Sequence, residues 1–311
     1  MSDATETIGN SLVRHGPGDG LAYLMKLHPA DAPEIIQNLE QLAFARGYSK
    51  VSAKVPAREA RQFVAAGYHL EATIPCYFQQ KDSACFMSKF LSEERKKERQ
   101  PLLVREVLVA ADAQQRAGME SLPAGLALRE AAKAEAGQMA LFYRELFTTK
   151  KLALHDPDYF TREMQRNSIF LGVWKERRLV ALCGALVDQG AFSAEMAGLA
   201  VLPECKGDGL ELHLLQQVEK RVLASGIGSA YALVRACSLG DNVTFARNGY
   251  RFGGTLTNNS NIHGRLESAN VWYKGLPDDP QVAWSSVFES PGNSRAPEGP
   301  IFQEEEGEPF P

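Results

Sequence analysis

Apolar and polar positions along the chain form two kinds of segment, short apolar runs and longer amphipathic stretches. The apolar run LAYLMKL predicts a strand, and DAPEIIQNLEQLAFARG predicts a helix with Asp31 as its N-cap and Gly47 as its end. SKVSAKV predicts a second strand, and AREARQFVAAGY predicts a second helix that ends at Gly67. Two more strands are expected near residues 70–74 and 84–90. The first part of the chain is therefore predicted to run strand, helix, strand, helix and two strands.

A second series of elements follows the charged segment LSEERKKERQ, which we interpret as a solvated, helical surface segment. REAAKAEAGQMALFYRELF predicts a helix, and the apolar runs IFLGVW and RLVALCGALV, separated by KER, predict a hairpin. SAEMAGLAVL predicts a strand, and residues 210–224 predict a helix with its Leu and Val residues on one face. SAYALVRA, DNVTFARNGY, RFGGTLT and ANVWYKGL then predict a strand, a short helix and two terminal strands.

The two series repeat each other. The segment FVAAGY, which ends at Tyr68, recurs as FARNGY, which ends at Tyr250, and each follows a helix that ends at a glycine, Gly47 or Gly226. The order of elements around both segments is the same, which indicates a duplication. The copies differ between the first strand and the first helix, because the first copy has LHPADAPEIIQ there and the second has PECKGDGLELH. Only the second copy has a glycine-rich turn into a helix.

The composition excludes several classes of protein. The chain has 311 residues, 44% of them hydrophobic and 23% charged, with a net charge of −4, which is typical of a globular protein of about two domains. Nothing favours a partner such as nucleic acid or an anionic membrane, since both attract basic patches. No apolar run approaches the roughly 18 residues of a membrane helix. The polar N-terminal segment MSDATETIGN is no signal peptide, so we expect a cytoplasmic location.

The cysteines and histidines give no sign of a metal or a disulfide. The chain has 5 cysteines, an odd number, with no Cys-x-x-Cys pair, and its 6 histidines lack the spacing of paired ligands. We therefore expect no metal cofactor and interpret the cysteines as small buried apolar residues. They are Cys76, Cys85, Cys183, Cys205 and Cys237.

The glycine-rich turn is the first candidate for a binding site. A helix N-terminus presents unpaired N–H groups and a partial positive charge, and glycines allow a phosphate to approach that backbone closely. Lys206 adds a cation beside Gly207 and Gly209. A tight turn that needs glycine explains the same residues equally well. The turn is neither a Walker A loop nor a dinucleotide-binding fingerprint, because the required spacings are missing.

The surrounding segment, LAVLPECKGDGL, resembles the coenzyme A loop of the GNAT superfamily of N-acetyltransferases. In that superfamily the pattern Arg/Gln-x-x-Gly-x-Gly/Ala follows a strand and opens a helix, and here it departs by having Lys206 at its first position and Glu211 at its last. The resemblance implies acetyl-CoA as cosubstrate, held by the strand before the loop and by the loop itself. The residues so implied are Leu199, Ala200, Val201, Lys206, Gly207, Asp208, Gly209 and Leu210.

A longer resemblance, from about Asp3 to Leu276, is to the β-lysine N-acetyltransferases within that superfamily. It is carried by ALVRACSLGDNVTFARNGYRFGGTLTNNSNIHGRLESANVWYKGL in the second half and by EATIP and FMSKFLSEER in the first. The resemblance implies an α/β (α+β) GNAT fold, a mixed central sheet flanked by helices, preceded by a partial GNAT-like half. We expect a noncatalytic GNAT-like half over residues 1–100, a linker over 101–125, the acetyltransferase domain over 126–276 and a disordered tail over 277–311.

The same resemblance implies transfer of an acetyl group to the terminal amine of β-lysine or a similar small diamine, giving a compatible solute. It also implies a functional link to a lysine 2,3-aminomutase, the enzyme that would supply β-lysine. Glu195 is the candidate base, because strand alternation puts it on the same face as Leu199. Arg235, with Arg265 as the alternative, is expected to pair with the acceptor carboxylate.

Glu267 and Asn259 are expected to hold an ammonium group of the acceptor. Many members use a tyrosine as acid at the position of Phe245, so no such acid is available here. Glu211, Gly198 and Phe245 depart from the family pattern and motivate a second hypothesis, a coenzyme A- or metabolite-binding regulatory module with lost or weak turnover. Acetylation of a protein lysine is a third.

Overall fold

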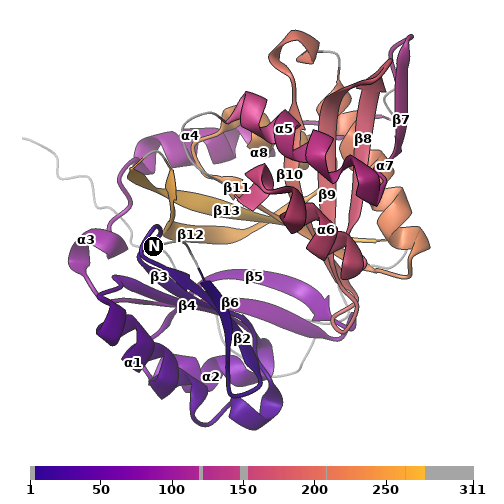
Figure 1. Ribbon diagram of the computed structural model, residues 1–311. Helices are drawn as coiled ribbons and strands as arrows, with labels where there is room; N and C mark the ends of the chain where they lie inside the picture. The colour runs from indigo at the N-terminus through magenta and orange to yellow at the C-terminus, as the bar shows by residue number, and fades with distance from the viewer. Residues whose placement is uncertain (1–3, 119–121, 148–152, 208, 263, 277–311) are drawn as a thin grey trace, which may run out of the picture. The chain divides into compact units, whose positions relative to one another are not determined.

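The computed structural model describes residues 4–118, 122–147, 153–207, 209–262 and 264–276. Their strands form one mixed sheet of 13 strands, in the order β1-β2-β3-β4-β6-β5-β12-β13-β11-β10-β9-β8-β7 (Figure 1). The expected tail, residues 277–311, lies outside the described residues. Among the helices that are described, none is both long and apolar enough to cross a membrane.

The first half of the sheet is built from six strands and is covered by two helices. α1 and α2 pack on β3, β4 and β6 (Figure 1), and α3 follows the last strand. The strands are β1 (Ala4–Ile8), β2 (Ser11–Gly16), β3 (Leu21–Lys26), β4 (Lys50–Pro56), β5 (His69–Phe78) and β6 (Asp82–Phe90), and the helices are α1 (Ile35–Arg46), α2 (Ala57–Ala65) and α3 (Glu93–Lys96).

In the second half, helices α5, α6, α7 and α8 lie against the strands or against one another (Figure 1). α7 packs on β8, β9 and β10, and α5 packs on β9 and on α6. The helices are α4 (Pro101–Asp112), α5 (Ala136–Leu146), α6 (Pro157–Gln165), α7 (Leu210–Ala224) and α8 (Leu239–Arg247). The strands are β7 (Leu126–Glu130), β8 (Ile169–Lys175), β9 (Arg178–Asp188), β10 (Ser193–Val201), β11 (Ser229–Arg235), β12 (Arg251–Ile262) and β13 (Arg265–Gly275).

The two halves have the same strand order. β2-β3-β4-β6-β5 in the first half corresponds to β9-β10-β11-β13-β12 in the second, with one parallel pair in each, β3 with β4 and β10 with β11. α1 and α7 connect the parallel pairs, and α2 and α8 follow them. The duplication inferred from the two Gly-Tyr segments therefore has a matching topology, and the equivalent strands β5 and β12 join the halves.

Hydrophobic burial follows this division. One cluster lies in each half, and each includes the apolar face of its connecting helix, with Leu214, Leu215, Val218 and Val222 of α7 all 0% exposed. A third, smaller cluster joins the halves and contains Tyr77 and Phe86 of the first half with Tyr231 and Val271 of the second. Burial of this size is the main stabilising contribution to each half and to their junction.

The junction between β5 and β12 depends on one close approach. Gly254 pairs with Ala72 and has φ of +137°, and a Cβ there would lie 2.6 Å from the Cα of Ala72. Only glycine allows the two strands to meet at this distance. Beside it, the Lys50 ammonium donates to the Glu71 carboxylate (2.7 Å) and to the carbonyl of Thr257 (2.8 Å), and the Thr257 N–H donates to Glu71 (2.7 Å). An ion pair thus replaces ladder hydrogen bonds where β12 bulges.

Several local features differ from the sequence predictions. The first helix begins at Ile35, and Asp31 lies in a separate 3-10 turn, Pro29–Asp31, so Asp31 is not the helix N-cap. The expected linker, residues 101–125, contains α4, which packs on α8. β1, β2, β7 and α6 were not predicted. Cys76, Cys85 and Cys183 are buried as expected, whereas Cys205 and Cys237 are half-buried.

Candidate active site

The parallel strands β10 and β11 separate after their first residues. Ser193, Ala194 and Glu195 pair with Ser229, Ala230 and Tyr231, and beyond Glu195 the register of this pair ends. Over residues 196–201 β10 therefore has no ladder partner on the side of β11, so the backbone N–H and C=O groups that point to that side are not used by the sheet. Such groups need partners, so this opening suits an extended, amide-containing ligand that binds like an added strand.

A bulge shapes the open part of β10. Ala197 pairs with Gly184 and Ala200 pairs with Leu182 on β9, so β10 has one residue more than its partner between these positions. One extra residue reverses the alternation of faces. Ala200, and not Leu199, therefore continues the face of Glu195, which corrects the expectation from strand alternation.

Tyr143 of α5 supports the bulge. Its hydroxyl donates to the carbonyl of Gly198, and its ring stacks on Phe160 at 5.9 Å between centroids. Tyr143 is 1% exposed, and burial raises its pKa well above the ordinary value, so it stays a neutral donor. The glycine at 198, noted as a departure from the family pattern, lies where this hydroxyl approaches the backbone.

The glycine-rich turn leads from β10 into α7 as predicted. Gly209 is the N-cap of α7, with φ of +69°, and Gly207 has φ of +95°. Among the described residues no side chain caps this helix N-terminus, and a Cβ at Gly207 would meet nothing within 4 Å. Lys206 is exposed and Leu210 is buried in the core, while Asp208 lies outside the described residues. The N–H groups of the first turn and the open space at Gly207 suit a phosphate group.

The corresponding turn of the first half is closed by a carboxylate. Asp31 accepts hydrogen bonds from the N–H of Asn10 (2.8 Å), in the turn between β1 and β2, and from the hydroxyl of Ser11 (2.6 Å), the first residue of β2. The bond from Ser11 is the main cause of its lowered pKa. A fixed negative charge at this position would repel a phosphate, so the first half offers no equivalent of the α7 turn.

Glu195 is part of a polar cluster that both halves build. The Tyr231 hydroxyl donates to Glu195 Oε2 (2.8 Å), and Lys54 of β4 donates to the hydroxyls of Tyr231 (3.1 Å) and Tyr77 (2.7 Å). Tyr77 and Tyr231 are buried, 1% and 4% exposed, whereas Lys54 and Glu195 keep part of their surface accessible. Burial and the charge of Glu195 raise the pKa of Tyr231 well above its ordinary value, which keeps the phenol neutral.

The residues expected to bind the acceptor are engaged elsewhere. Arg235 forms a bidentate ion pair with Glu267, with distances of 2.8 and 3.0 Å, so the two charges balance each other. The Asn259 carbonyl accepts from Arg95, and its side chain bonds to Ser260. None of these contacts involves Glu195.

The position of the expected acid is apolar. Phe245 is 4% exposed and packs edge-on against Tyr250, with ring centroids 5.0 Å apart. Burial raises the pKa of Tyr250 well above its ordinary value, and the charge of Glu219 raises it further by a smaller amount. Both rings belong to the core of the second half, and a phenylalanine at position 245 has no proton to donate.

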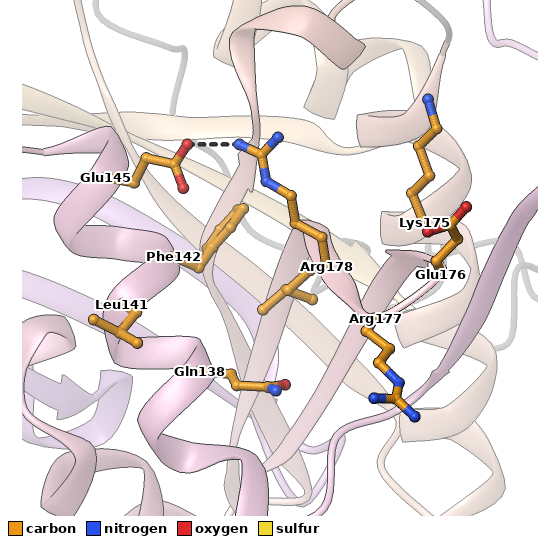
Figure 2. A pocket seen from close by; sticks show the side chains of 9 residues that line it. Gln138, Leu141, Phe142, Glu145, Lys175, Glu176, Arg177 and Arg178 are labelled. Atoms are coloured by element: carbon orange, nitrogen blue, oxygen red, sulfur yellow. Dashed lines mark hydrogen bonds and ion pairs between the residues drawn. The ribbon is translucent and has the colours of Figure 1, made fainter.

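A separate pocket of about 460 Å³ lies between α5 and the turn of the β8–β9 hairpin. Figure 2 shows Glu145 of α5 reaching across to Arg178 of the hairpin, and Arg178 also pairs with Glu204. No lining residue comes from β10, β11 or α7. The pocket is therefore distinct from the opening beside β10.

The comparisons with known proteins agree with this geometry. A family model described as the acetyltransferase (GNAT) family matches residues 138–250. A β-lysine N(6)-acetyltransferase of Methanococcus maripaludis is 30% identical over 267 residues, which cover 86% of this chain and 97% of that protein. The chain belongs to the GNAT acetyltransferase family.

Two further matches to this GNAT protein are a second curated relative and a solved structure with a weaker likeness. A β-lysine N(6)-acetyltransferase of Methanosarcina mazei is 26% identical over 264 residues, 78% of this chain and 97% of that protein. A solved phosphinothricin acetyltransferase of Sinorhizobium meliloti, in complex with AcCoA, is 17% identical, with a TM-score of 0.43, and the match covers 49% of this chain and 88% of that one.

Membership of the GNAT family confirms several predictions made from the sequence. It is an N-acetyltransferase, and the predicted family, fold class and enzyme class are confirmed. Acetyl-CoA as acetyl donor agrees with the family. The opening between β10 and β11 offers backbone groups along one strand, and the start of α7 offers N–H groups at a helix N-terminus, which are groups suited to a pantetheine arm and a diphosphate.

Sequence reasoning missed the first-half side of the GNAT protein's polar cluster. Lys54 was assigned only to a predicted strand, and Tyr77 lies beyond the strand predicted near residues 70–74. A signal was present in KVSAKVP, where Lys50, Ser52 and Lys54 alternate with apolar residues. Polar and charged residues at alternate positions of a central strand indicate that one face of the strand contacts polar groups or solvent. The sequence alone does not show that this face meets Glu195.

Proposed function

We propose that this acetyltransferase acetylates the terminal amine of β-lysine or a closely similar small diamino acid, with acetyl-CoA as donor. The observation that carries the proposal is the polar cluster around Glu195, to which both halves contribute. The match to the Methanococcus maripaludis protein spans 97% of that relative and so includes both halves. An acceptor site made by both halves agrees with that shared length.

The donor site in this proposal is the opening beside β10. When bound, acetyl-CoA supplies an acetyl group activated as a thioester. The unpaired backbone of Leu199, Ala200 and Val201 suits the acetyl and pantetheine groups, and a backbone N–H there would stabilise charge on the carbonyl oxygen. The first turn of α7, with Gly207 and Gly209 before it and Lys206 beside it, suits the diphosphate.

Glu195 is the proposed base. An amine attacks only when neutral, so the ammonium of the acceptor must lose a proton, which a carboxylate within hydrogen-bond reach accepts. Glu195 takes the first proton, from the ammonium. The C–N bond then forms, the C–S bond breaks, and the coenzyme A sulfur leaves as a thiolate that takes up the second proton from the nitrogen, which gives the free thiol and the amide. Tyr231 fixes one carboxylate oxygen, Oε2, and leaves the other for the acceptor. Arg235, Asn259 and Glu267 are used by other contacts and have no role in this step.

The wider role that we propose is synthesis of a compatible solute. Acetylation of the terminal amine removes its positive charge and leaves a zwitterion of the β-amine and the carboxylate. A lysine 2,3-aminomutase would supply the acceptor, and adjacent genes for the two enzymes would support the link. We also propose a cytoplasmic location, because acetyl-CoA is made and used there.

The test is a thiol-release assay with acetyl-CoA and a panel of acceptors: β-lysine, α-lysine, cadaverine, spermidine and a lysine-containing peptide. We expect release with β-lysine at the highest kcat/KM and a product acetylated on the terminal nitrogen, located by fragmentation in a mass spectrometer. Binding of acetyl-CoA without thiol release from any acceptor of the panel would refute the proposal.

A variant tests the base. Glu195→Gln keeps the shape and an oxygen to accept from Tyr231, but it takes up no proton, so we expect kcat to fall about 10²–10⁴-fold. The affinity for acetyl-CoA should stay within about twofold. Glu145→Gln, which removes a carboxylate paired with Arg178 away from the opening, is the control and should keep nearly full activity. Retention of activity by Glu195→Gln would exclude this role.

A further inference from the structure

The inner face of β4 presents polar residues toward the second half of the chain. Val51, Ala53 and Val55 lie in the core beneath α1 and α2, and the alternate positions Lys50, Ser52 and Lys54 point the other way. Lys50 and Ser52 are buried, 0% and 5% exposed, whereas Lys54 keeps part of its surface accessible. β4 therefore brings two lysines to the face that meets the catalytic half.

The two lysines differ in how their charges are balanced. The Lys50 ammonium lies 2.7 Å from the Glu71 carboxylate. Within the part of the chain that the structure describes, Lys54 has no carboxylate at ion-pair distance, and its partners are the phenol oxygens of Tyr77 and Tyr231. These phenols occupy two of the three N–H donors of the ammonium. The nearest carboxylate of the cluster, Glu195, reaches it only through the Tyr231 hydroxyl.

Lys54 is nevertheless protonated at neutral pH. Burial alone would lower its pKa, but Tyr77, Tyr23 and then Glu195 act in the opposite direction and raise the pKa above its ordinary value. The rings of Tyr77 and Tyr231 add to this, because Lys54 Nζ lies 4.7 and 5.1 Å from their centroids. An ammonium that is charged, largely desolvated and without a paired anion favours an anionic ligand.

The position of Lys54 relative to Glu195 fits an amino acid. A single phenol oxygen, that of Tyr231, separates the ammonium from the carboxylate by hydrogen bonds of 3.1 and 2.8 Å. Lys54, Glu195 and Tyr23 are all partly accessible. Because the two groups share one phenol oxygen, a diamino acid that contacts both must bind in a bent conformation, with its carboxylate at Lys54 and its terminal amine at Glu195.

We propose, resting on the proposed function, that Lys54 of the first half binds the carboxylate of the acceptor. The noncatalytic half then supplies the group that restricts acetylation to amino acids, and simple diamines of similar length are poor acceptors. Tyr77 and Tyr231 hold the Lys54 side chain in place, and Tyr231 sets the distance between the carboxylate subsite and the base.

The test uses two acceptors that differ only in charge, β-lysine and β-lysinamide, in which a neutral carboxamide replaces the carboxylate. For the wild-type protein we expect kcat/KM for β-lysine to exceed that for β-lysinamide by about 10- to 100-fold, the effect of one hydrogen bond between charged groups. In Lys54→Met, kcat/KM for β-lysine should fall by that factor, and the value for β-lysinamide should change by less than about threefold. The preference should thus disappear.

Two further variants separate binding from structure. Lys54→Arg keeps the charge and should retain part of the preference. Lys50→Met removes the other lysine of the same strand face and should lower stability and both kcat/KM values together, without changing their ratio. If Lys54→Met lowers kcat/KM equally for β-lysine and for β-lysinamide, Lys54 acts only by positioning Tyr231 and Glu195. The proposed carboxylate subsite would then be refuted. An unchanged preference would also overturn it.

A binding measurement keeps this inference distinct from the proposed function. If the wild-type protein acetylates neither acceptor, the proposed function fails, and calorimetry with 3-aminohexanoate, which is β-lysine without its terminal amine, decides the subsite. Binding to the wild-type protein with coenzyme A present, lost in Lys54→Met, supports the subsite. No binding to the wild type, or equal binding to both proteins, refutes it.

Discussion

Glu211 is the residue of the coenzyme loop that fits its expected ligand least well. It lies in the first turn of α7, close to where a diphosphate would bind, and it has no ion-pair partner among the described residues. A carboxylate in the first turn favours the helix through the macrodipole, whereas it repels an anionic ligand at the same N-terminus. The same charge therefore has opposite effects on folding and on binding.

Substitution of Glu211 separates these effects. Glu211→Gln should tighten coenzyme A binding about three- to fivefold, because a partly exposed repulsion is worth up to about 1 kcal/mol. It should also lower the free energy of unfolding by about 0.3–1 kcal/mol. Calorimetry and urea unfolding measure the two changes.

Glu204→Gln is the control for the coenzyme loop. Its carboxylate is close in sequence but pairs with Arg178, so its removal should not tighten coenzyme A binding. Unchanged or weaker binding in Glu211→Gln would show that the diphosphate does not lie at the start of α7.

At the scale of single residues, the sequence indicated which side chains could take part in catalysis better than it indicated which side chains contact each other. Glu195 lies beside the strand opening, as its place on the predicted strand suggested. Arg235 and Glu267 were assigned to opposite ends of the acceptor, yet they bind each other, because β11 and β13 are neighbours in the sheet. Strand pairing between distant segments decides such contacts, and a single sequence does not show it.

At the scale of elements, a buried asparagine fixes the turn between β11 and α8. Asn242 is 0% exposed and donates to the carbonyls of Arg235 (2.9 Å) and Ser238 (2.7 Å). Its side-chain oxygen accepts from Asn270 (2.9 Å) and from the indole of Trp272 (2.8 Å) on β13. This network ties the end of β11, the start of α8 and the neighbouring strand together.

Removal of that side chain leaves several buried groups without partners. Asn242→Ala should lower the free energy of unfolding by about 2–4 kcal/mol, since each unsatisfied buried group costs about 1–3 kcal/mol. The midpoint of urea denaturation measures the change. Thr244→Ala, which removes only a bond to Gly240 within the same helix, should cost less than about 1 kcal/mol. Equal losses in the two variants would mean that the network contributes nothing beyond local helix stability.

The elements themselves were predictable where the pattern was long. α7 spans residues 210–224 as predicted, because its apolar residues recur at helical spacing and a glycine follows. β1 and β7 were missed because their residues are mostly exposed and give no periodic apolar signal. The bulge in β10 was missed because an extra residue in a strand is defined by its partner β9, which lies elsewhere in the sequence.

At the scale of the whole molecule, the halves meet through contacts that the element pattern does not show. The sequence suggested a repeat, but the joining of β5 to β12 and the buried pair of Lys50 and Glu71 arise only when the halves pack together. Lys54 reaches Tyr231 across the same junction. In the proposed function the first half contributes Lys54 to the acceptor site, and its own turn between β3 and α1 has no glycine-rich segment.

The buried pair at the junction gives a test of this dependence. Glu71 is 6% exposed in its side chain and Lys50 is 0%, and Glu71→Gln removes the counter-charge of Lys50 while keeping an oxygen for the Thr257 N–H. We expect a loss of about 3–5 kcal/mol in unfolding free energy, the usual cost of leaving one charge of a buried pair. Because the junction also positions Lys54, KM for the acceptor should rise, whereas the affinity for coenzyme A should change by less than about twofold.

The double variant Lys50→Met with Glu71→Gln completes a thermodynamic cycle. Removal of both charges takes away the isolated buried ammonium, so the double variant should regain most of the stability lost in Glu71→Gln, with a coupling of about 2 kcal/mol or more. The acceptor KM should recover with it, since Lys54 itself is unchanged. If coenzyme A affinity fell in parallel with acceptor binding in Glu71→Gln, the junction would support the whole catalytic half and not the acceptor side alone, and the division of labour between the halves would be wrong.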